Sequence, residues 1–98
     1  MKSDLQSLKN IGPKMEAHLR VIGISSVEEF LDIGSSEIAK RLFLSGEVKP
    51  HPMYYYALVA AEQGRDVFSF DRAEKAELKE VYSDIIAFSR SIETFWWS

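Results

Sequence analysis

Apolar residues recur along most of this 98-residue chain at the three- and four-residue spacing of α-helices. Strict alternation of apolar and polar residues, the pattern of a half-buried strand, never continues for more than four residues. The pattern therefore predicts a compact all-α domain of five or six helices. Its core is expected to come from four short segments: Met15, Leu19 and Ile22; Phe30 and Leu31; Ile38, Leu42 and Phe43; and Met53, Ala57, Leu58 and Ala61.

Glycine and proline divide this pattern into short helices. Four glycines recur at spacings of 11, 11 and 12 residues: Gly12, Gly23, Gly34 and Gly46. The last three predict helix C-termini, because glycine readily takes the left-handed conformation that ends many helices. Pro13 and Pro52 fit first helical positions, and Gly64 closes the segment that Pro52 opens. Helices of about two turns explain the spacing, and an internal repeat is the alternative interpretation.

Two further helix starts are marked by capping boxes. In such a box, the side chain before the helix accepts a hydrogen bond from a backbone N–H three residues later, and an acidic side chain there reciprocates. Two registers fit the first box and one fits the start of the last helix: Ser25 with Glu28 or Ser26 with Glu29, and Asp71 with Glu74.

The chain beyond about residue 71 carries a longer and more regular apolar pattern. Its members are spaced three and four residues apart, like the seam of a coiled coil, and Trp96 widens the stripe: Leu78, Val81, Ile85, Phe88, Ile92 and Phe95. A long C-terminal helix is therefore predicted. It either packs across its own domain or pairs its outer half with a second copy through this seam and Trp96. Anchoring to a membrane surface is disfavoured, because few basic residues lie nearby.

Composition narrows the class of protein. Twelve Lys and Arg against 15 Asp and Glu residues give a net charge of −3, which argues against a nucleic-acid coat protein. The absence of cysteine excludes disulfides, thiolate metal sites and thiol catalysis. No apolar run approaches the ~18 residues of a membrane span, and the first residues lack the apolar stretch of a signal peptide. We expect one cytoplasmic domain without membrane contact.

Residue types that carry out catalysis or bind metals are sparse. His18 and His51 are 33 residues apart, and neither has a histidine four residues away of the kind that metal sites use. The carboxylates fall where caps and solvated helix faces place them. The sequence also lacks glycine-rich nucleotide loops and a serine-nucleophile motif. We therefore expect structural histidines and a protein that is not an enzyme and holds no metal or cofactor.

The turn before Pro13 is the best candidate for a binding site. The first N–H groups of a helix have no intrahelical acceptor, and together with the helix dipole they favour a phosphate. Residues 1–24 hold four basic and two acidic residues, a net charge of +2, whereas the remaining residues sum to −5. The predicted DNA-phosphate contacts surround the glycine that lets the backbone approach closely: Lys9, Asn10, Gly12, Lys14 and Met15.

Three short motifs carry a resemblance to a known family: Leu8-Lys9-Asn10-Ile11-Gly12-Pro13-Lys14, Leu19-Arg20-Val21-Ile22-Gly23-Ile24 with Val27-Glu28-Glu29-Phe30, and Tyr55-Tyr56-Ala57-Leu58-Val59-Ala60-Ala61-Glu62-Gln63-Gly64-Arg65. Together they make residues 4–80 resemble the C-terminal domain of the TfoX/Sxy competence regulators. The resemblance implies an all-helical domain with a helix–hairpin–helix-like N-terminal half, a motif class that elsewhere binds the DNA backbone without reading sequence. It also implies that the backbone N–H groups of Gly12, Lys14 and Met15 face the phosphate.

The chain departs from the family pattern in three ways. The N-terminal TfoX domain of the two-domain regulators is absent from this sequence, so the resemblance does not imply transcriptional activation of competence genes. Asn10 stands where many DNA-binding hairpins have a glycine, and Val67 and Phe68 occupy the region of the family's tryptophan. Residues 81–98 look like a C-terminal extension of a family-like core at residues 1–80, within a single domain.

Two functions are consistent with these features. In the first, the domain is a non-enzymatic regulatory or accessory module that binds DNA weakly and without sequence preference through the turn before Pro13. In the second, it is a protein-interaction or homodimerisation module that makes no nucleic-acid contact and uses the surface from Leu78 to Trp97. The sequence leaves both open.

Overall fold

The structure, a computed structural model, describes residues 4–46 and 48–97, with side chains described for residues 5–46 and 48–88. Within these residues the chain forms five α-helices and two short 3₁₀ helices, and no strand. The predicted all-α fold with a long C-terminal helix is confirmed.

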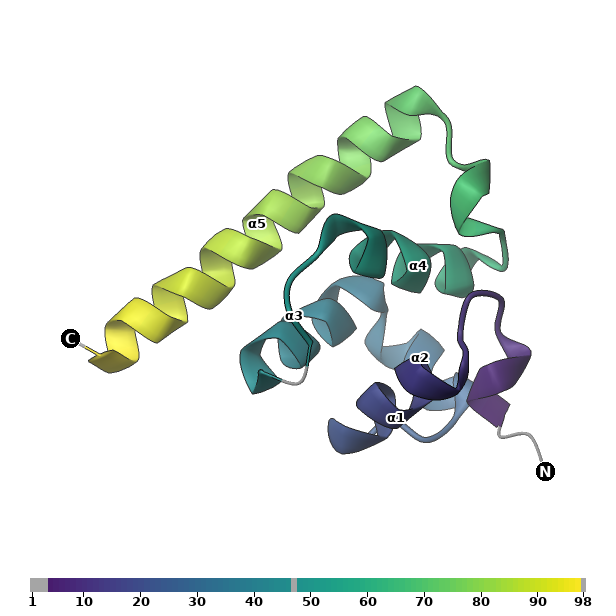
Figure 1. The fold of residues 1–98 in the computed structure, drawn as a ribbon, viewed down its shortest axis with the longest axis horizontal. Helices are drawn as coiled ribbons and strands as arrows, with labels where there is room; N and C mark the ends of the chain where they lie inside the picture. The colour runs from purple at the N-terminus through teal and green to yellow at the C-terminus, as the bar shows by residue number, and fades with distance from the viewer. Residues whose placement is uncertain (1–3, 47, 98) are drawn as a thin grey trace.

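The N-terminal half contains the predicted turn and the three shorter helices. A single 3₁₀ turn, η1 (Asp4–Ser7), leads into α1 (Pro13–Val21), and α2 (Val27–Ile33) and α3 (Ser35–Ser45) follow. Where the resemblance predicts a helix–hairpin–helix-like unit, the structure has η1, the connecting turn and α1, so the element before the turn is a single 3₁₀ turn. In Figure 1, α1 and α2 lie at the base of the domain and α3 lies above them.

The C-terminal half covers these helices from one side. α4 (Pro52–Gln63) lies against α3, and the short η2 (Val67–Ser69) connects α4 to α5 (Arg72–Trp97). α5 crosses over α3 and α4, and its C-terminal part continues beyond the other helices (Figure 1). Pro52 and Gly64 stand at the two ends of α4 as predicted, Pro52 as its first residue and Gly64 just after its last.

The core lies between the lower helices and the inner face of α5. Its largest fully buried side chains come from every α-helix, from η1 and from the connection between α1 and α2: Leu5, Leu19, Ile24, Phe30, Ile38, Leu42, Leu58 and Ile85. Two predicted core positions are wrong, because Leu31 and Met53 are 47% and 41% exposed. Neighbouring residues in a helix point about 100° apart, so the short α2 buries Phe30 and turns Leu31 outward.

Hydrogen bonds settle the predicted helix starts. At α2 the Ser26 register is correct, because the Glu29 backbone N–H donates to Ser26 Oγ at 3.1 Å. At α5 the Glu74 N–H donates to Asp71 Oδ1 at 2.8 Å and the Asp71 N–H donates to Glu74 Oε1 at 3.1 Å. This pair is a complete capping box, as the spacing predicted.

Candidate functional site

The turn between η1 and α1 places an open helix start at the protein surface. The Leu8 N–H donates to the Leu5 carbonyl at 3.1 Å and the Ile11 N–H donates to the Leu8 carbonyl at 3.3 Å, which folds the turn onto the buried Ile11. Gly12 then occupies the N-cap position with extended backbone and, being glycine, supplies no capping side chain. Among the described side chains, none makes a capping hydrogen bond to α1, so its first N–H groups remain available to an anion.

Asn10 gives this turn its shape. It is the non-glycine residue with a positive φ, 71°, within the described chain, and thus takes the conformation that glycine supplies in many hairpins. Its side-chain amide donates to the Arg65 carbonyl at 2.9 Å and accepts from the Val67 N–H at 3.3 Å. Because these bonds engage both ends of the Asn10 side chain, a phosphate at this residue would meet its backbone.

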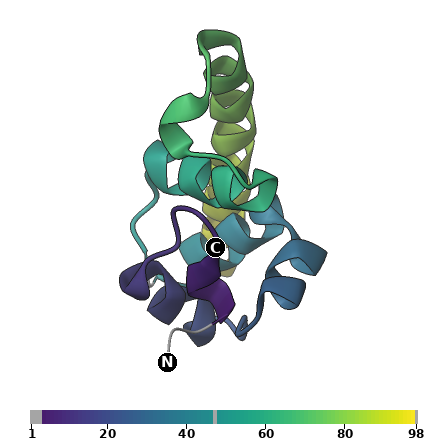
Figure 2. The same cartoon turned by 90° about the vertical axis from the view of Figure 1, so that its right-hand side faces the viewer.

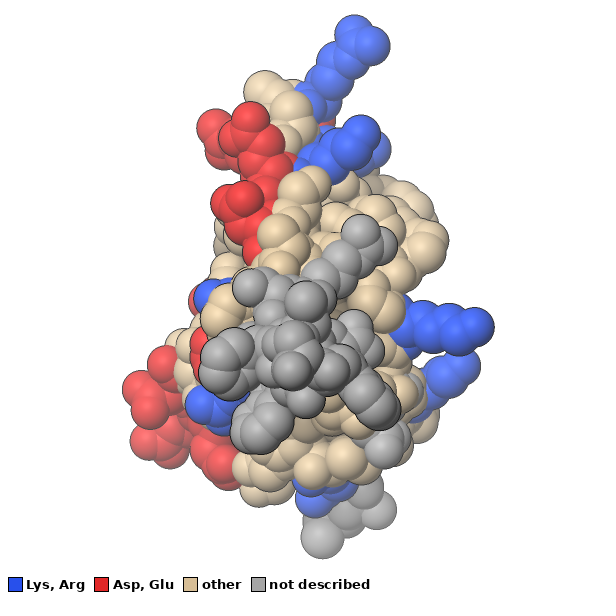
Figure 3. Space-filling view, turned by 90° about the vertical axis from the view of Figure 1, so that its left-hand side faces the viewer, with Lys and Arg blue, Asp and Glu red and all other residues tan. Residues whose placement is uncertain are grey.

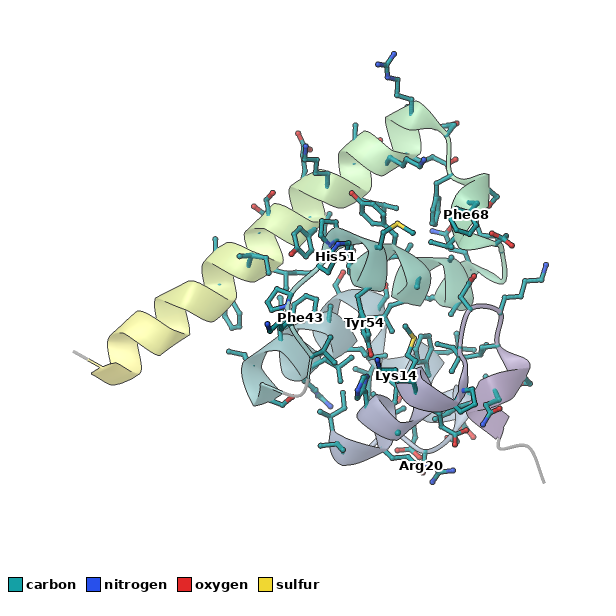
Figure 4. The ribbon with its side chains drawn as sticks, viewed as in Figure 1. Lys14, Arg20, Phe43, His51, Tyr54 and Phe68 are labelled. Carbon is teal, nitrogen blue, oxygen red and sulfur yellow. The ribbon has the colours of Figure 1, made fainter. Side chains whose placement is uncertain are left out.

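The other predicted phosphate contacts are of two kinds, charged side chains and backbone N–H groups. Lys9, Gly12 and Lys14 are exposed, so the two ammonium groups are accessible beside the open helix start; Figure 4 labels Lys14 on α1. Met15 is partly buried and packs against the core, so its contribution to an anion site would be its N–H. Arg20, further along α1, forms an ion pair with Glu16 at 3.6 Å.

Three of the other α-helices begin with a side chain that caps their backbone. Ser26 caps α2, His51 Nδ1 accepts from the Met53 N–H at 3.1 Å at the start of α4, and Asp71 caps α5. In the first turn of α3, the Ser35 hydroxyl donates to the Glu62 carboxylate at 2.6 Å. Gly34, the N-cap of α3, supplies no capping side chain either, so within the described helices α1 and α3 share an uncapped start and differ in the carboxylate bonded to the first residue of α3.

Both histidines have structural roles. His18 Nδ1 lies 3.1 Å from the Tyr54 hydroxyl, a hydrogen bond that joins α1 to α4. Burial raises the pKa of Tyr54 to about 12, so the phenol stays neutral across the physiological range. His51 acts as the cap of α4. Within the described residues no group of three His, Asp or Glu side chains is placed to hold a metal ion.

The structure divides the predicted seam of α5. Ile85 is buried in the core and Leu78 is partly buried against it, so these two side chains pack within their own domain. Val81 and Phe88 are 37% and 43% exposed, and the Lys40 ammonium lies 5.1 Å from the centroid of the Phe88 ring. The other predicted interface residues lie beyond the described side chains: Ile92, Phe95 and Trp96.

Charge is unevenly distributed over the surface. In Figure 3, which views the domain from the C-terminal end of α5, acidic side chains gather along one edge and most basic side chains project from the opposite edge. A surface of this kind offers positive charge locally in spite of the net charge of −3. No helix in the described part of the chain is long and apolar enough to cross a membrane.

Sequence reasoning missed the residues that support the turn from outside it. Arg65 holds the α4–η2 connection: its carbonyl accepts from Asn10, and its guanidinium donates to the Glu74 carboxylate. The ring of Phe70 lies under the same guanidinium at 4.4 Å. No local signal marks this contact, because Asn10 and Arg65 are 55 residues apart in the chain.

These features define a class of protein: a small all-α domain in which the turn between η1 and α1 leads into a helix start without a capping side chain. The model of the TfoX C-terminal domain family matches residues 1–82, and the chain belongs to that family. An uncharacterised protein from Listeria monocytogenes, solved in a triclinic crystal form, is 33% identical with a TM-score of 0.73; the match covers 83% of this chain and 91% of that one. None of the curated proteins compared with the chain matches it.

Proposed function

We propose that this TfoX C-terminal domain is a non-enzymatic accessory module that binds the nucleic-acid backbone weakly and without sequence preference. The contact is the turn at residues 8–12 together with the first turn of α1. The observation that carries the proposal is the open start of α1, which lacks a capping side chain and is accompanied by the exposed side chains of Lys9 and Lys14.

The physical basis is the attraction between a helix N-terminus and a phosphate. The free N–H groups of Lys14 and Met15 point along the helix dipole toward the turn, and both favour a negative charge. A site of this kind recognises the phosphate and carries no information about the base sequence. The buried side chain of Ile11 and the two hydrogen bonds of Asn10 hold the turn in place before a ligand arrives.

The contact is expected to be weak and sensitive to salt. Each phosphate neutralised on duplex DNA contributes about −0.9 to the slope of log K against log salt. With Lys9 and Lys14 as the charged contacts, a slope near −2 is expected, far below that of a protein with an extensive basic surface. Net negative charge elsewhere on the domain limits the contact to the turn.

A charge-reversal experiment tests the proposal. We expect the double variant Lys9→Glu/Lys14→Glu to lose most affinity for a fluorescent duplex at ~50 mM salt, because the phosphate then meets two carboxylates. The control variant Lys75→Glu/Lys79→Glu makes the same change of charge on α5, on the opposite side of the domain from α1 (Figure 1). Its affinity is expected to fall much less.

Two results would contradict this function. The first is the absence of binding by the unmodified protein to duplex or single-stranded DNA at ~50 mM salt. The second is an equal loss in both double variants, which would assign the binding to overall charge rather than to the turn. Circular dichroism of each variant shows whether the fold is retained.

A second candidate function is homodimerisation through the outer half of α5. The observation that favours it is the continuation of α5 beyond the other helices (Figure 1), since the apolar sequence pattern also continues there. We propose that Phe88, Ile92, Phe95 and Trp96 would then pair with a second copy. Ile85 and Leu78 take no part, because they pack within the domain.

Sedimentation distinguishes this candidate from the first. A chain that ends at Phe88 keeps Ile85 in the core and removes three of the four pairing residues, Ile92, Phe95 and Trp96. If the seam pairs, the full chain sediments as a dimer and the shortened chain as a monomer. The substitution Ile92→Glu is expected to have the same effect, whereas Ser91→Glu, outside the seam, leaves the dimer intact. A full chain that is monomeric at every concentration contradicts the candidate.

A further inference from the structure

Phe68 is a strongly exposed aromatic residue, with 80% of its surface accessible. It lies on η2, in the connection between α4 and α5, where Figure 4 labels it. Single exposed apolar residues are common at protein surfaces and need no explanation by themselves. Phe68 differs from such residues in the number of bonds that fix the backbone around it.

The backbone on both sides of Phe68 is held by short hydrogen bonds. The Phe68 N–H donates to Asp66 Oδ1 at 2.8 Å, and the Ser69 N–H donates to the Asp66 carbonyl at 3.0 Å. The Arg65 guanidinium donates to the Ser69 carbonyl at 2.9 Å and to its hydroxyl at 2.8 Å. A ring presented on a backbone fixed in this way loses less conformational entropy when it binds a partner.

The same connection is bonded to the turn before α1. The residue before Phe68, Val67, donates its N–H to Asn10 Oδ1 at 3.3 Å, and Asn10 donates to the Arg65 carbonyl at 2.9 Å. The turn and this connection lie on the same face of the domain, as Figures 1 and 2 agree. The backbone that carries the exposed ring is therefore bonded to the turn that leads into α1.

The surroundings of the ring indicate what it contacts. Exposed polar residues, Asp66 and Ser69, flank Phe68, so the ring is not part of a broad apolar patch of the kind that docks a protein. The Asp66 carboxylate would repel a phosphate. A nucleic-acid base fits these surroundings. It needs only a single aromatic ring to stack on, and because it is neutral the Asp66 carboxylate does not repel it.

We propose that Phe68 stacks on an unpaired base of a strand whose phosphate lies at the start of α1, so that the ligand is single-stranded nucleic acid. This inference rests on the proposed function, which supplies the phosphate contact. Bases within a duplex are paired and already stacked on one another, so they cannot reach the ring without first being unstacked. Stacking on an aromatic side chain tolerates any base, which agrees with a contact that does not read sequence.

Three ligands of equal length distinguish the contribution of the base to the binding affinity from that of the phosphate. They are a fluorescent thymidine strand of about 12 nucleotides, an abasic strand of that length, and a duplex. Anisotropy titrations at ~50 mM salt are expected to show about 5- to 10-fold tighter binding of the thymidine strand than of the abasic strand. In Phe68→Ala the two strands are expected to bind with equal affinity, and the affinity for the abasic strand is expected to stay unchanged. Phe68→Trp retains the preference for the thymidine strand, and Val21→Ala, which alters another exposed apolar residue, does not affect it.

The outcomes distinguish this inference from the function on which it rests. Equal affinities for the thymidine and abasic strands would contradict the stacking contact and would still agree with the phosphate contact. An unchanged ratio of the two affinities in Phe68→Ala would contradict the stacking contact in the same way. Failure to bind all three ligands removes the proposed function and the stacking contact together. A smaller sedimenting mass for Phe68→Ala than for the unmodified chain would assign the ring to self-association and overturn the inference.

Discussion

Two helices of this domain begin after the same pair of residues, and their starts differ in the neighbour that lies beside them. α1 follows Ile11-Gly12 and α3 follows Ile33-Gly34. Neither glycine supplies a capping side chain. At α3, however, the Glu62 carboxylate of α4 accepts a hydrogen bond from the hydroxyl of the first helical residue, Ser35, at 2.6 Å. The two starts therefore differ in their tertiary neighbour: a carboxylate already lies beside the start of α3, where the helix dipole favours a negative charge.

The backbones of the two starts also differ. Gly34 has φ 87° and ψ 152°, a combination that residues with a Cβ avoid, and it lets α2 run directly into α3. Gly12 has φ −97° and ψ −178°, which any residue adopts. In the turn before α1 the left-handed conformation falls on Asn10, two residues earlier, with φ 71°.

The largest effect is expected at Asn10. Asn10→Ala removes two hydrogen bonds and places a residue with a Cβ and no compensating polar group at a positive φ, which together cost about 3 kcal/mol of unfolding free energy. Asn10→Gly removes the same hydrogen bonds without the backbone strain and is expected to cost about 1–2 kcal/mol. Urea unfolding of both variants measures the difference. Equal losses would show that the left-handed conformation contributes nothing to the cost.

The next effect compares the two glycines directly. Gly34→Ala is expected to lower the unfolding free energy by about 2 kcal/mol, because its φ strains any residue with a Cβ. At Gly12 a Cβ would meet nothing within 4 Å and φ is negative; Gly12→Ala is expected to change stability by about 0.5 kcal/mol at most. Thermal and urea unfolding check both. A loss at Gly12 as large as that at Gly34 would contradict the contrast between the starts.

Removal of the carboxylate that is bonded to the first residue of α3 is expected to have a smaller effect. Glu62→Ala leaves the buried Ser35 hydroxyl without its acceptor and is expected to cost about 1 kcal/mol. Glu62→Gln keeps an acceptor and should cost less. Urea unfolding of the two variants measures the contribution of the carboxylate. If Glu62→Ala is as stable as the unmodified protein, Glu62 does not stabilise the start of α3.

The smallest expected effect is a pH dependence of the unfolding free energy that comes from Glu74. This residue bonds to Arg65, whose carbonyl accepts a hydrogen bond from Asn10 in the turn before α1. Hydrogen bonds from the Arg65 side chain, and then from the Asp71 N–H, lower the pKa of Glu74 below its ordinary value of 4.5. A carboxyl whose pKa is lower in the folded state stabilises the fold above the unfolded pKa, and this contribution is lost as the pH falls through the folded pKa.

The stability of the unmodified protein relative to Glu74→Gln is therefore expected to be greatest near neutral pH and to shrink as the pH falls below 4.5. Urea midpoints of both proteins over a series of pH values measure it. A difference that stays constant with pH would show that ionisation of Glu74 does not support the loop that carries Arg65.

Much of the fold follows from signals close together in the chain. Ser26 and Asp71 cap their helices through a residue three positions later, and Pro52 begins α4 where its fixed backbone and missing N–H predict it. The resemblance to the TfoX C-terminal domain is likewise confirmed by the family match over residues 1–82. Burial within a helix is less predictable from such local signals. Phe30 and Leu31 are adjacent apolar residues, and the sequence does not reveal that only Phe30 faces the core.

The candidate site was predicted in part. The sequence placed Gly12, Lys9 and Lys14 at the start of a helix, and the structure puts them there with exposed side chains or backbone. It did not reveal that the Asn10 side chain bonds across the domain to Arg65 and Val67. It also did not reveal that one residue of the predicted seam of α5, Ile85, is buried in the core of its own domain.

The sequence by itself determined where the helices begin and end, and hence the all-α class, because caps, prolines and glycines act within a single helical turn. Only the tertiary structure decided which side chains of other helices bond to a helix start or to the turn before it. Glu62 reaches Ser35 from 27 residues away and Asn10 reaches Arg65 from 55 residues away. Such contacts arise when the chain folds back on itself, so no local pattern of residues records them.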